Sequence, residues 1–371
     1  MQGLGVGIAE NSRAVPNLVH ESPSSDYGCV IWARSSILSL MDVFALTRKL
    51  IDIESTTGME AAVGVALAGE LTQLGYNVER MPVEGDRVNI WATHPGHPQP
   101  ALALSTHMDT VPPFIPSSET ADRIYGRGSC DAKGIIVAQI AAAEKLEAEG
   151  IHVGLLFLVG EERDSQGAQT ANQQPRGVKY LINGEPTENR LALASKGTLR
   201  VELTARGRMA HSAYPELGES AIEKLLDAVH EIRKLKLPEN PKAGPCTLNI
   251  GQIEGGRAPN VIPDLAVAQL LFRLVGPAEE LRRQITQAAG DKAEAHFKLE
   301  IPYMELGTVP GIETMVAKFT TDIPALTRWG KPLLIGPGSI HVAHTDAEYI
   351  EKKQLLDAID LYAKIAHGLL A

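Results

Sequence analysis

The chain has 371 residues, of which 44% are hydrophobic and 22% are charged, and its formal net charge is −10. This composition is typical of a soluble globular protein, and the length favours two domains because a single core rarely grows beyond about 250 residues. The acidic excess argues against nucleic acid and against an anionic membrane surface as partners. No apolar run in the sequence approaches the roughly 18 residues of a membrane-spanning helix.

Residues 1–40 lack the basic start and apolar core of a secretory signal. We predict a poorly ordered tail there, with Met41 as the natural beginning of the folded chain. The three cysteines are few and widely spaced, which indicates a reducing compartment without a disulfide framework. We therefore expect a cytoplasmic protein.

The first part of the folded chain alternates helices with apolar strands. The expected elements are a helix that starts at 41 and ends near 55, a helix at 60–74, strands at 76–81, 87–93 and 101–106, a helix at 135–149, and strands at 152–159 and 178–182. The continuous apolar run at 152–159 is typical of a strand buried on both faces. This alternation predicts an α/β layer fold with a mixed sheet flanked by helices.

From residue 197 onward the pattern changes. The order becomes strand, helix, strand, strand, helix, strand, at 198–206, 220–234, 247–253, 265–274, 277–289 and 296–301. This order is the ferredoxin-like α+β arrangement. We then expect a helix at 312–319, a strand at 332–335 and a final helix at 352–369. The sequence therefore predicts a catalytic domain at 41–196 and 307–371, with an inserted lid and dimerisation domain at 197–306.

Imidazole and carboxylate side chains follow the ends of three expected strands. These are His107 with Asp109, the adjacent Glu161 and Glu162, and Glu185. Open α/β sheets place their ligand sites at the carboxyl ends of strands, so we expect these side chains to lie close together. Residues two apart in an extended chain point to one face, so Asp109 can fix which ring nitrogen of His107 is free.

Asp131 and His344 complete the candidate set, one at the opening of a helical run and one in the last loop. Taken singly, each residue has an ordinary alternative as solvated surface chemistry. Together they offer nitrogen and oxygen donors without thiolate, which suits zinc or cobalt at a catalytic site. Two histidines and three carboxylates exceed the needs of one ion. The set therefore predicts a two-metal site with one bridging carboxylate.

Six motifs carry a resemblance to a known family. They are S-T-H-M-D-T-V at 105–111, G-R-G-S-C-D-A-K-G at 126–134, G-E-E at 160–162, G-E-P-T at 184–187, H-S-A-Y-P at 211–215 and A-H-T-D-A-E-Y at 343–349. Over nearly all of 41–371 the chain resembles the di-zinc amidohydrolases and exopeptidases. This family includes acetylornithine deacetylase, succinyl-diaminopimelate desuccinylase, aminoacylase and glutamate carboxypeptidase.

The resemblance implies a ligand assignment for two zinc ions, which cobalt could replace. His107 and Glu185 would bind one ion, and Glu162 and His344 would bind the other. Asp131 would bridge the two ions and be followed by a cis peptide bond to Ala132. Asp109 would orient His107.

The resemblance also implies roles in catalysis. Glu161 would be the general base, which takes a proton from the metal-held water and returns it to the leaving amine. His211 in the inserted domain would donate to the oxyanion, in family dimers often from the partner subunit. A surface residue at the start of a helix is the plain alternative for His211.

Three further residues lie where family members hold the substrate carboxylate: Asn260, Arg273 and Gly338, which ends the loop Gly336–Gly338. An arginine suits that task because its guanidinium forms two parallel hydrogen bonds. Arg273 could equally be a surface charge at the end of a strand. The family also implies a homodimer formed through the inserted domain.

The ending GPGSIHVAHTDAEYI resembles the acetylornithine and acetyl-lysine deacetylase branch. We therefore expect hydrolysis of an N-acetyl-L-ornithine or N-acetyl-lysine type of substrate, as in arginine biosynthesis. A desuccinylase, dipeptidase or carboxypeptidase could use the same machinery. A Cys or Ser hydrolase built on Cys130 or Ser129 has little support, because no Gly-x-Ser-x-Gly elbow occurs. A non-catalytic scaffold is a third reading, which the complete ligand set disfavours.

Overall fold

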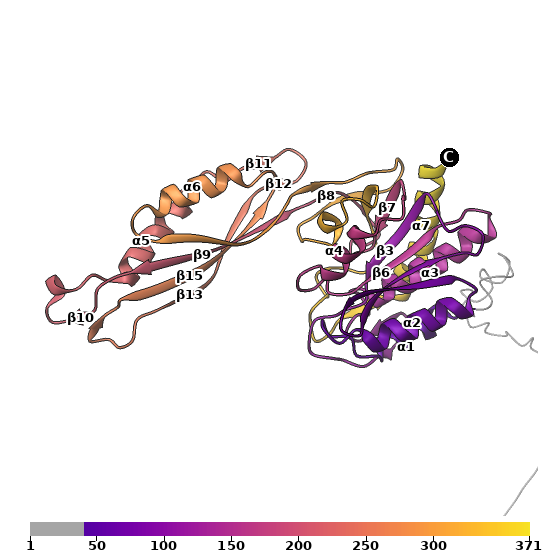
Figure 1. Cartoon of the computed structure of the whole chain (residues 1–371), viewed down its shortest axis with the longest axis horizontal. Coiled ribbons are helices and arrows are strands. Elements are labelled where there is room, and N and C mark those ends of the chain that lie inside the picture. The colour runs from indigo at the N-terminus through magenta and orange to yellow at the C-terminus, as the bar shows by residue number, and fades with distance from the viewer. Residues whose placement is uncertain (1–40) are drawn as a thin grey trace, which may run out of the picture.

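The structure is a computed structural model that describes residues 41–371. Two bodies lie end to end, a larger one built around a six-stranded sheet and an elongated one with two helices on a four-stranded sheet (Figure 1). The tail predicted over residues 1–40 lies outside the described residues. Within 41–371, no helix combines the length and the apolar character that crossing a membrane requires.

The larger body holds a mixed sheet with strand order β1-β2-β6-β3-β7-β19, in which β3, β6, β7 and β19 run parallel. Its strands are β1 (Asn77–Glu84), β2 (Arg87–Thr93), β3 (Leu102–His107), β6 (Gly154–Leu158), β7 (Tyr180–Asn183) and β19 (Lys331–Leu334). Its helices are α1 (Val43–Ile51), α2 (Ala61–Gln73), α3 (Lys133–Ala148), α4 (Gln166–Gln173) and α7 (Lys352–Leu370).

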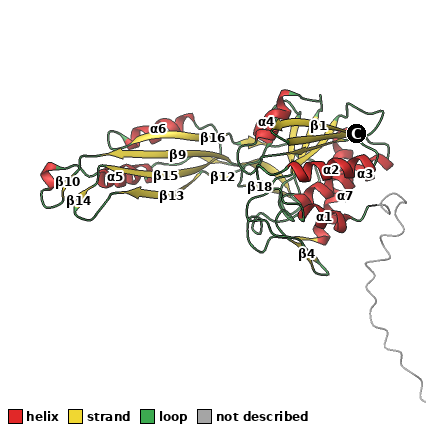
Figure 2. Ribbon diagram, turned by 60° about the horizontal axis from the view of Figure 1, so that its bottom comes forward, coloured by secondary structure: helices red, strands yellow, loops and turns green. Residues whose placement is uncertain are grey.

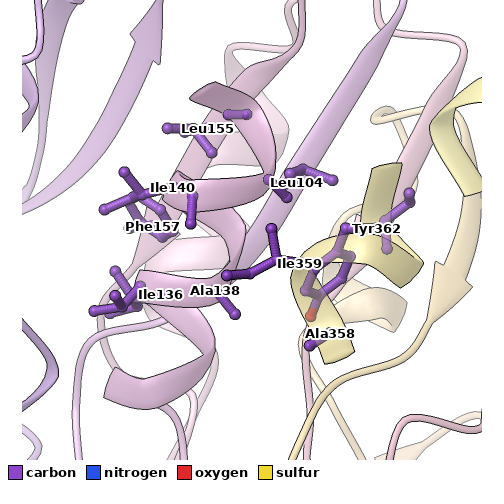
Figure 3. Packing of buried hydrophobic residues seen from close by; sticks show 14 of the residues in the cluster. Leu104, Ile136, Ala138, Ile140, Leu155, Phe157, Ala358, Ile359 and Tyr362 are labelled. Atoms are coloured by element: carbon purple, nitrogen blue, oxygen red, sulfur yellow. The ribbon is translucent and has the colours of Figure 1, made fainter. Parts of the chain in front are cut away.

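Both faces of this sheet are buried, as the apolar run at 152–159 predicts. Leu155 and Phe157 of β6 point into the cluster that α3 and α7 cover, where Tyr362 also packs (Figure 3). Leu156 and Leu158 point to the opposite face, into a cluster with Trp329. Alternate residues of one strand thus fill two cores, which explains why β6 has no polar position.

Two three-stranded sheets flank the central one, with orders β20-β5-β4 and β17-β8-β18. Their strands are β4 (Ser118–Glu119), β5 (Arg123–Tyr125), β8 (Leu191–Ser195), β17 (Met304–Glu305), β18 (Thr314–Ala317) and β20 (Tyr349–Glu351), and a short 3₁₀ helix η2 covers Ile323–Ala325. The helix predicted at 312–319 is wrong, because β18 occupies it and pairs in parallel with β8. The β-branched Thr314 and Val316 suit a strand, and β8 offers backbone groups to pair with.

The elongated body follows the predicted order of strand, helix, strand, strand, helix, strand. These elements are β9 (Gly197–Arg206), α5 (Ala221–Arg233), β13 (Thr247–Gly255), β15 (Leu265–Leu274), α6 (Glu279–Ala289) and β16 (Glu294–Ile301), with sheet order β13-β15-β9-β16. Small elements are β10 (Ala210–His211), η1 (Pro215–Leu217), β11 (Glu239–Asn240), β12 (Gly244–Pro245) and β14 (Val261–Ile262).

Alternation along β9 gives the elongated body its own core. Leu199, Val201 and Leu203 are buried together with Leu225 of α5 and Ile285 of α6, and both helices lie along one face of the sheet (Figures 1 and 2). The domain boundaries at 196/197 and 306/307 stay predictions.

Candidate metal centre

Three neighbouring parallel strands deliver the candidate site. β3 ends at His107, β6 is followed by the turn with Glu161 and Glu162, and β7 is followed by Glu185. Because β3 lies between β6 and β7 and all three run the same way, their carboxyl ends meet at one edge of the sheet.

The five predicted ligands form two groups that share one residue. The ligand atoms of His107, Asp131 and Glu185 lie within 4.8 Å of one another, and so do those of Asp131, Glu162 and His344. In the first group, His107 Nε2 is 2.9 Å from Asp131 Oδ1. In the second, His344 Nε2 is 3.3 Å from Asp131 Oδ2 and 2.9 Å from Glu162 Oε1. Asp131 thus presents one oxygen to each group, as a bridging carboxylate must. The peptide bond from Asp131 to Ala132 is cis, as expected.

Asp109 is buried and contacts both sides of the site. Its main-chain oxygen accepts a hydrogen bond from His107 Nδ1 at 3.0 Å, and its carboxylate lies 3.5 Å from the same nitrogen. The carboxylate also accepts from Thr57 Oγ1 at 2.8 Å and from the backbone N–H groups of Glu161 and Glu162 at 3.1 and 3.2 Å. Asp109 therefore ties the ring of His107 to the Glu161–Glu162 turn.

The site crowds buried carboxylates together, which disfavours their charged forms. Burial, and then the charge of Glu185, raise the pKa of Glu161 well above its ordinary value. Burial likewise raises the pKa of Glu185, and within residues 41–371 its buried Oε1 has no hydrogen-bond partner. Hydrogen bonds to Asp131 and Glu162 raise the pKa of His344 to about 10. These residues fit a pair of divalent cations, because such ions neutralise clustered carboxylates.

Four of the five predicted ligands, Asp131, Glu162, Glu185 and His344, line a cleft of about 610 Å³ between the two bodies. Arg273 at the end of β15 and Thr198 at the start of β9 line it too. Arg273 Nη1 donates to Thr198 Oγ1 at 2.8 Å, and burial lowers the pKa of the guanidinium. Arg273 forms no ion pair with any of the described residues. Its guanidinium is therefore available to bind an anion in the cleft.

Three predicted site residues lie elsewhere. His211 and Asn260 are exposed at the tip of the elongated body, far from β3 and β6 in Figure 1, where Ser212 N–H donates to the Asn260 carbonyl at 3.0 Å. The structure of one chain does not bring them to the metal ligands. Gly338 is not among the residues that line the cleft. Its φ is +86°, and a Cβ there would lie 2.5 Å from Cys130 Sγ.

Sequence reasoning assigned no role to Thr57, Asp322 or Glu348. Asp322 is buried, and neither of its carboxylate oxygens has a hydrogen-bond partner among residues 41–371. Thr57 and Asp322 belong to none of the six motifs. Glu348 does lie in the same motif as His344. Its place four positions after a candidate ligand is the sequence feature that could have pointed to a role for it.

Known proteins resemble this chain in sequence and in fold. The family described as the peptidase dimerisation domain (M20_dimer) matches residues 193–297. A peptidase M20 domain-containing protein of Schizosaccharomyces pombe is 36% identical over 92% of each chain. A probable carboxypeptidase of Aspergillus fumigatus is 37% identical over 90% of this chain and 88% of its own.

Solved structures show the same fold at lower identity. Aminopeptidase PepT of Bacillus cereus superposes with a TM-score of 0.76 at 20% identity, over 89% of this chain and 98% of its own. A dinuclear metal-binding peptidase of Bacillus subtilis gives a TM-score of 0.64 at 16% identity, over 87% and 96%. With a relative above one-third identity over nearly its full length, the chain belongs to the M20 peptidase family.

Proposed function

We propose that the chain is a metal-dependent hydrolase that cleaves the amide bond next to a residue with a free carboxylate. The observation that carries this proposal is the pair of ligand groups that share Asp131. His107 and Glu185 would hold one divalent ion, and Glu162 and His344 the other, with zinc as the first choice and cobalt as a substitute. Such ions supply Lewis-acid polarisation of a carbonyl oxygen and acidify water.

Glu161 is the general base in this proposal. It lines the cleft beside both ligand groups and belongs to neither. Its position after β6 is held by the hydrogen bond from its backbone N–H to Asp109. A carboxylate whose pKa burial raises is suited to take a proton from water and to return it to the leaving amine near neutral pH.

Arg273 supports a substrate that carries a carboxylate, because an unpaired guanidinium in a cleft binds that group through two parallel hydrogen bonds. A peptide with a free C-terminal residue and an N-acetyl amino acid both present this anion next to the scissile amide. The probable carboxypeptidases among the relatives favour the peptide. The ending GPGSIHVAHTDAEYI favours an N-acetyl amino acid of the ornithine or lysine type.

The test is amine release from four compounds by zinc-loaded protein: N-acetylornithine, N-acetyl-lysine, an unblocked dipeptide and the C-terminal amide of that dipeptide. We expect turnover that stops when a chelator removes the metal, and a higher KM for the C-terminal amide than for the dipeptide with its free carboxylate. The preferred acyl group then separates the peptidase from the deacetylase. Turnover that survives metal removal, or silence on every compound with two ions bound, would overturn the proposal.

We also infer that the chain works as a homodimer formed through the elongated body. The match of residues 193–297 to the peptidase dimerisation domain supports this assembly. His211 is exposed at the far tip, so a second copy is the route by which it would meet a cleft. There it would donate to the developing oxyanion, with Asn260 beside it.

A further inference from the structure

Glu348 is a fully buried carboxylate that binds the loop carrying Asp131. Its Oε1 accepts from the backbone N–H groups of Gly128, Cys130 and Asp131 at 2.9, 3.1 and 3.1 Å. Its Oε2 accepts from Arg127 Nη1 at 2.6 Å. A buried charge is tolerated when it is paired and its lone pairs are filled. Glu348 meets both conditions, so its contacts are specific to this loop.

Arg127 extends the same network to the segment that carries His344. Its Nη1 also donates to the carbonyl of Thr345 at 3.1 Å, and its Nε donates to the carbonyl of Pro113 at 3.3 Å. His344 itself has a φ of +64°, a conformation that costs a non-glycine residue about 1 kcal/mol or more and persists when its surroundings hold it. The guanidinium fixes the carbonyl directly after that residue.

We infer that Glu348 and Arg127 are positioning residues that set Asp131 against His344. The inference rests on the proposed function, because Asp131 and His344 form the second ligand group together with Glu162. The other ligands depend on other anchors: Asp109 holds His107 and the backbone of Glu162. Asp131 belongs to both groups, but the pair also holds the segment of His344, which belongs to the second group alone. Loss of the Glu348–Arg127 pair therefore affects the second group more than the first.

The chemistry of the pair makes Glu348→Gln a sharp perturbation. Glutamine has the same size, but one of its two terminal atoms is an NH₂ group, which donates and does not accept. If this group faces Arg127, two donors oppose each other. If it faces the loop, three backbone N–H groups lose their acceptor. Arg127→Lys keeps the positive charge but loses the planar fork, so it gives a milder second variant.

The test titrates zinc into metal-free wild-type, Glu348→Gln and Arg127→Lys proteins by calorimetry and follows amide hydrogen exchange of the metal-free proteins. We expect one of the two ions to bind about 10- to 100-fold more weakly in the variants, the range seen when groups that orient ligands are removed. Exchange at Gly128, Cys130 and Asp131 should accelerate. Phe272→Leu, in the core of the elongated body, is the matched control for general destabilisation and should change neither readout.

The inference would be overturned if both variants bound the two ions as tightly as the wild-type protein and exchanged these amides at the wild-type rate. The pair would then have a purely structural role. Equal weakening of both ions, matched by Phe272→Leu, would overturn it too. If Glu348→Gln does not fold, Arg127→Lys decides between the same outcomes. Wild-type protein that takes up no zinc would overturn the proposed function instead, and the exchange data would still decide whether the anchor holds the loop.

Discussion

Glu161 is the residue at which catalysis and metal binding can be separated. We expect Glu161→Gln to lower kcat by about 10²- to 10⁴-fold, the usual contribution of a general base, with zinc content at the wild-type level. Glu162→Gln is the matched comparison, because Glu162 is adjacent in sequence but lies in a ligand group and should lose zinc. Elemental analysis beside steady-state kinetics checks both. A Glu161→Gln protein that also lost its metal would make Glu161 a ligand.

Arg273 tests which end of the substrate the cleft holds. We expect Arg273→Met to raise KM about tenfold or more for a substrate with a free carboxylate, with kcat little changed, because the interaction is made equally in the ground and transition states. The C-terminal amide of the same substrate should show no change. Arg200, exposed on the same sheet outside the cleft, supplies the control Arg200→Met. Equal losses on acid and amide would remove Arg273 from carboxylate binding.

The two candidate ligand groups, and Asp109 beside His107, could be predicted from sequence, whereas Thr57 and Glu348 could not. Each ligand follows a strand end or lies in a recognisable motif, so local pattern was sufficient. Thr57 meets Asp109 across 52 positions, and Glu348 meets Gly128 across 220. Contacts over such separations leave no periodic or spacing signal along the chain, because folding alone brings the partners together.

At the scale of elements, two side chains of β2 bind the residues before and after the turn that carries Glu161. Arg87 binds Glu60 through Nε and Nη2, both at 2.7 Å, and donates to Gln166 Oε1 at 2.8 Å. Asn89 accepts from Val159 N–H at 3.1 Å and donates to the Gly167 carbonyl at 2.8 Å. The turn is thereby fixed before and after Glu161 and Glu162.

We expect Arg87→Met to lower the free energy of unfolding by about 3–5 kcal/mol, because it leaves the buried Glu60 carboxylate unpaired. Urea denaturation measures this loss. Arg80→Met, on the exposed side of β1, should change stability by less than about 0.5 kcal/mol. A loss near that of Arg80→Met would mean that the Glu60 charge is compensated elsewhere.

The elements themselves were largely predictable, and the exception is informative. Strand β6 follows from a continuous apolar run and the strands of the elongated body from polar and apolar alternation, and the sequence displays both patterns directly. The segment around Thr314–Ala317 is short, and its strand conformation depends on pairing with β8, whose sequence lies more than 100 positions earlier. Short apolar runs do not distinguish helix from strand, so tertiary contact decides between them.

At the scale of the whole molecule, one chain brings the two candidate ligand groups and Arg273 to one cleft but leaves His211 exposed at the tip of the elongated body. If two copies complete each other's clefts, Glu161→Gln in one chain and His211→Ala in the other place both defects in the same cleft. The second cleft of that mixed dimer is then intact. Each parent homodimer carries a defect in both clefts.

We therefore expect mixed dimers, purified through two different affinity tags, to regain about half of wild-type activity while both parents stay nearly inactive, as the symmetry of a twofold dimer requires. Size-exclusion chromatography with light scattering checks the assembly. Mixed dimers as inactive as their parents would show that His211 does not act across subunits. Full activity of the His211→Ala homodimer would show instead that oxyanion stabilisation comes from the cleft itself, which would direct attention to Arg273 and the ligand groups beside it.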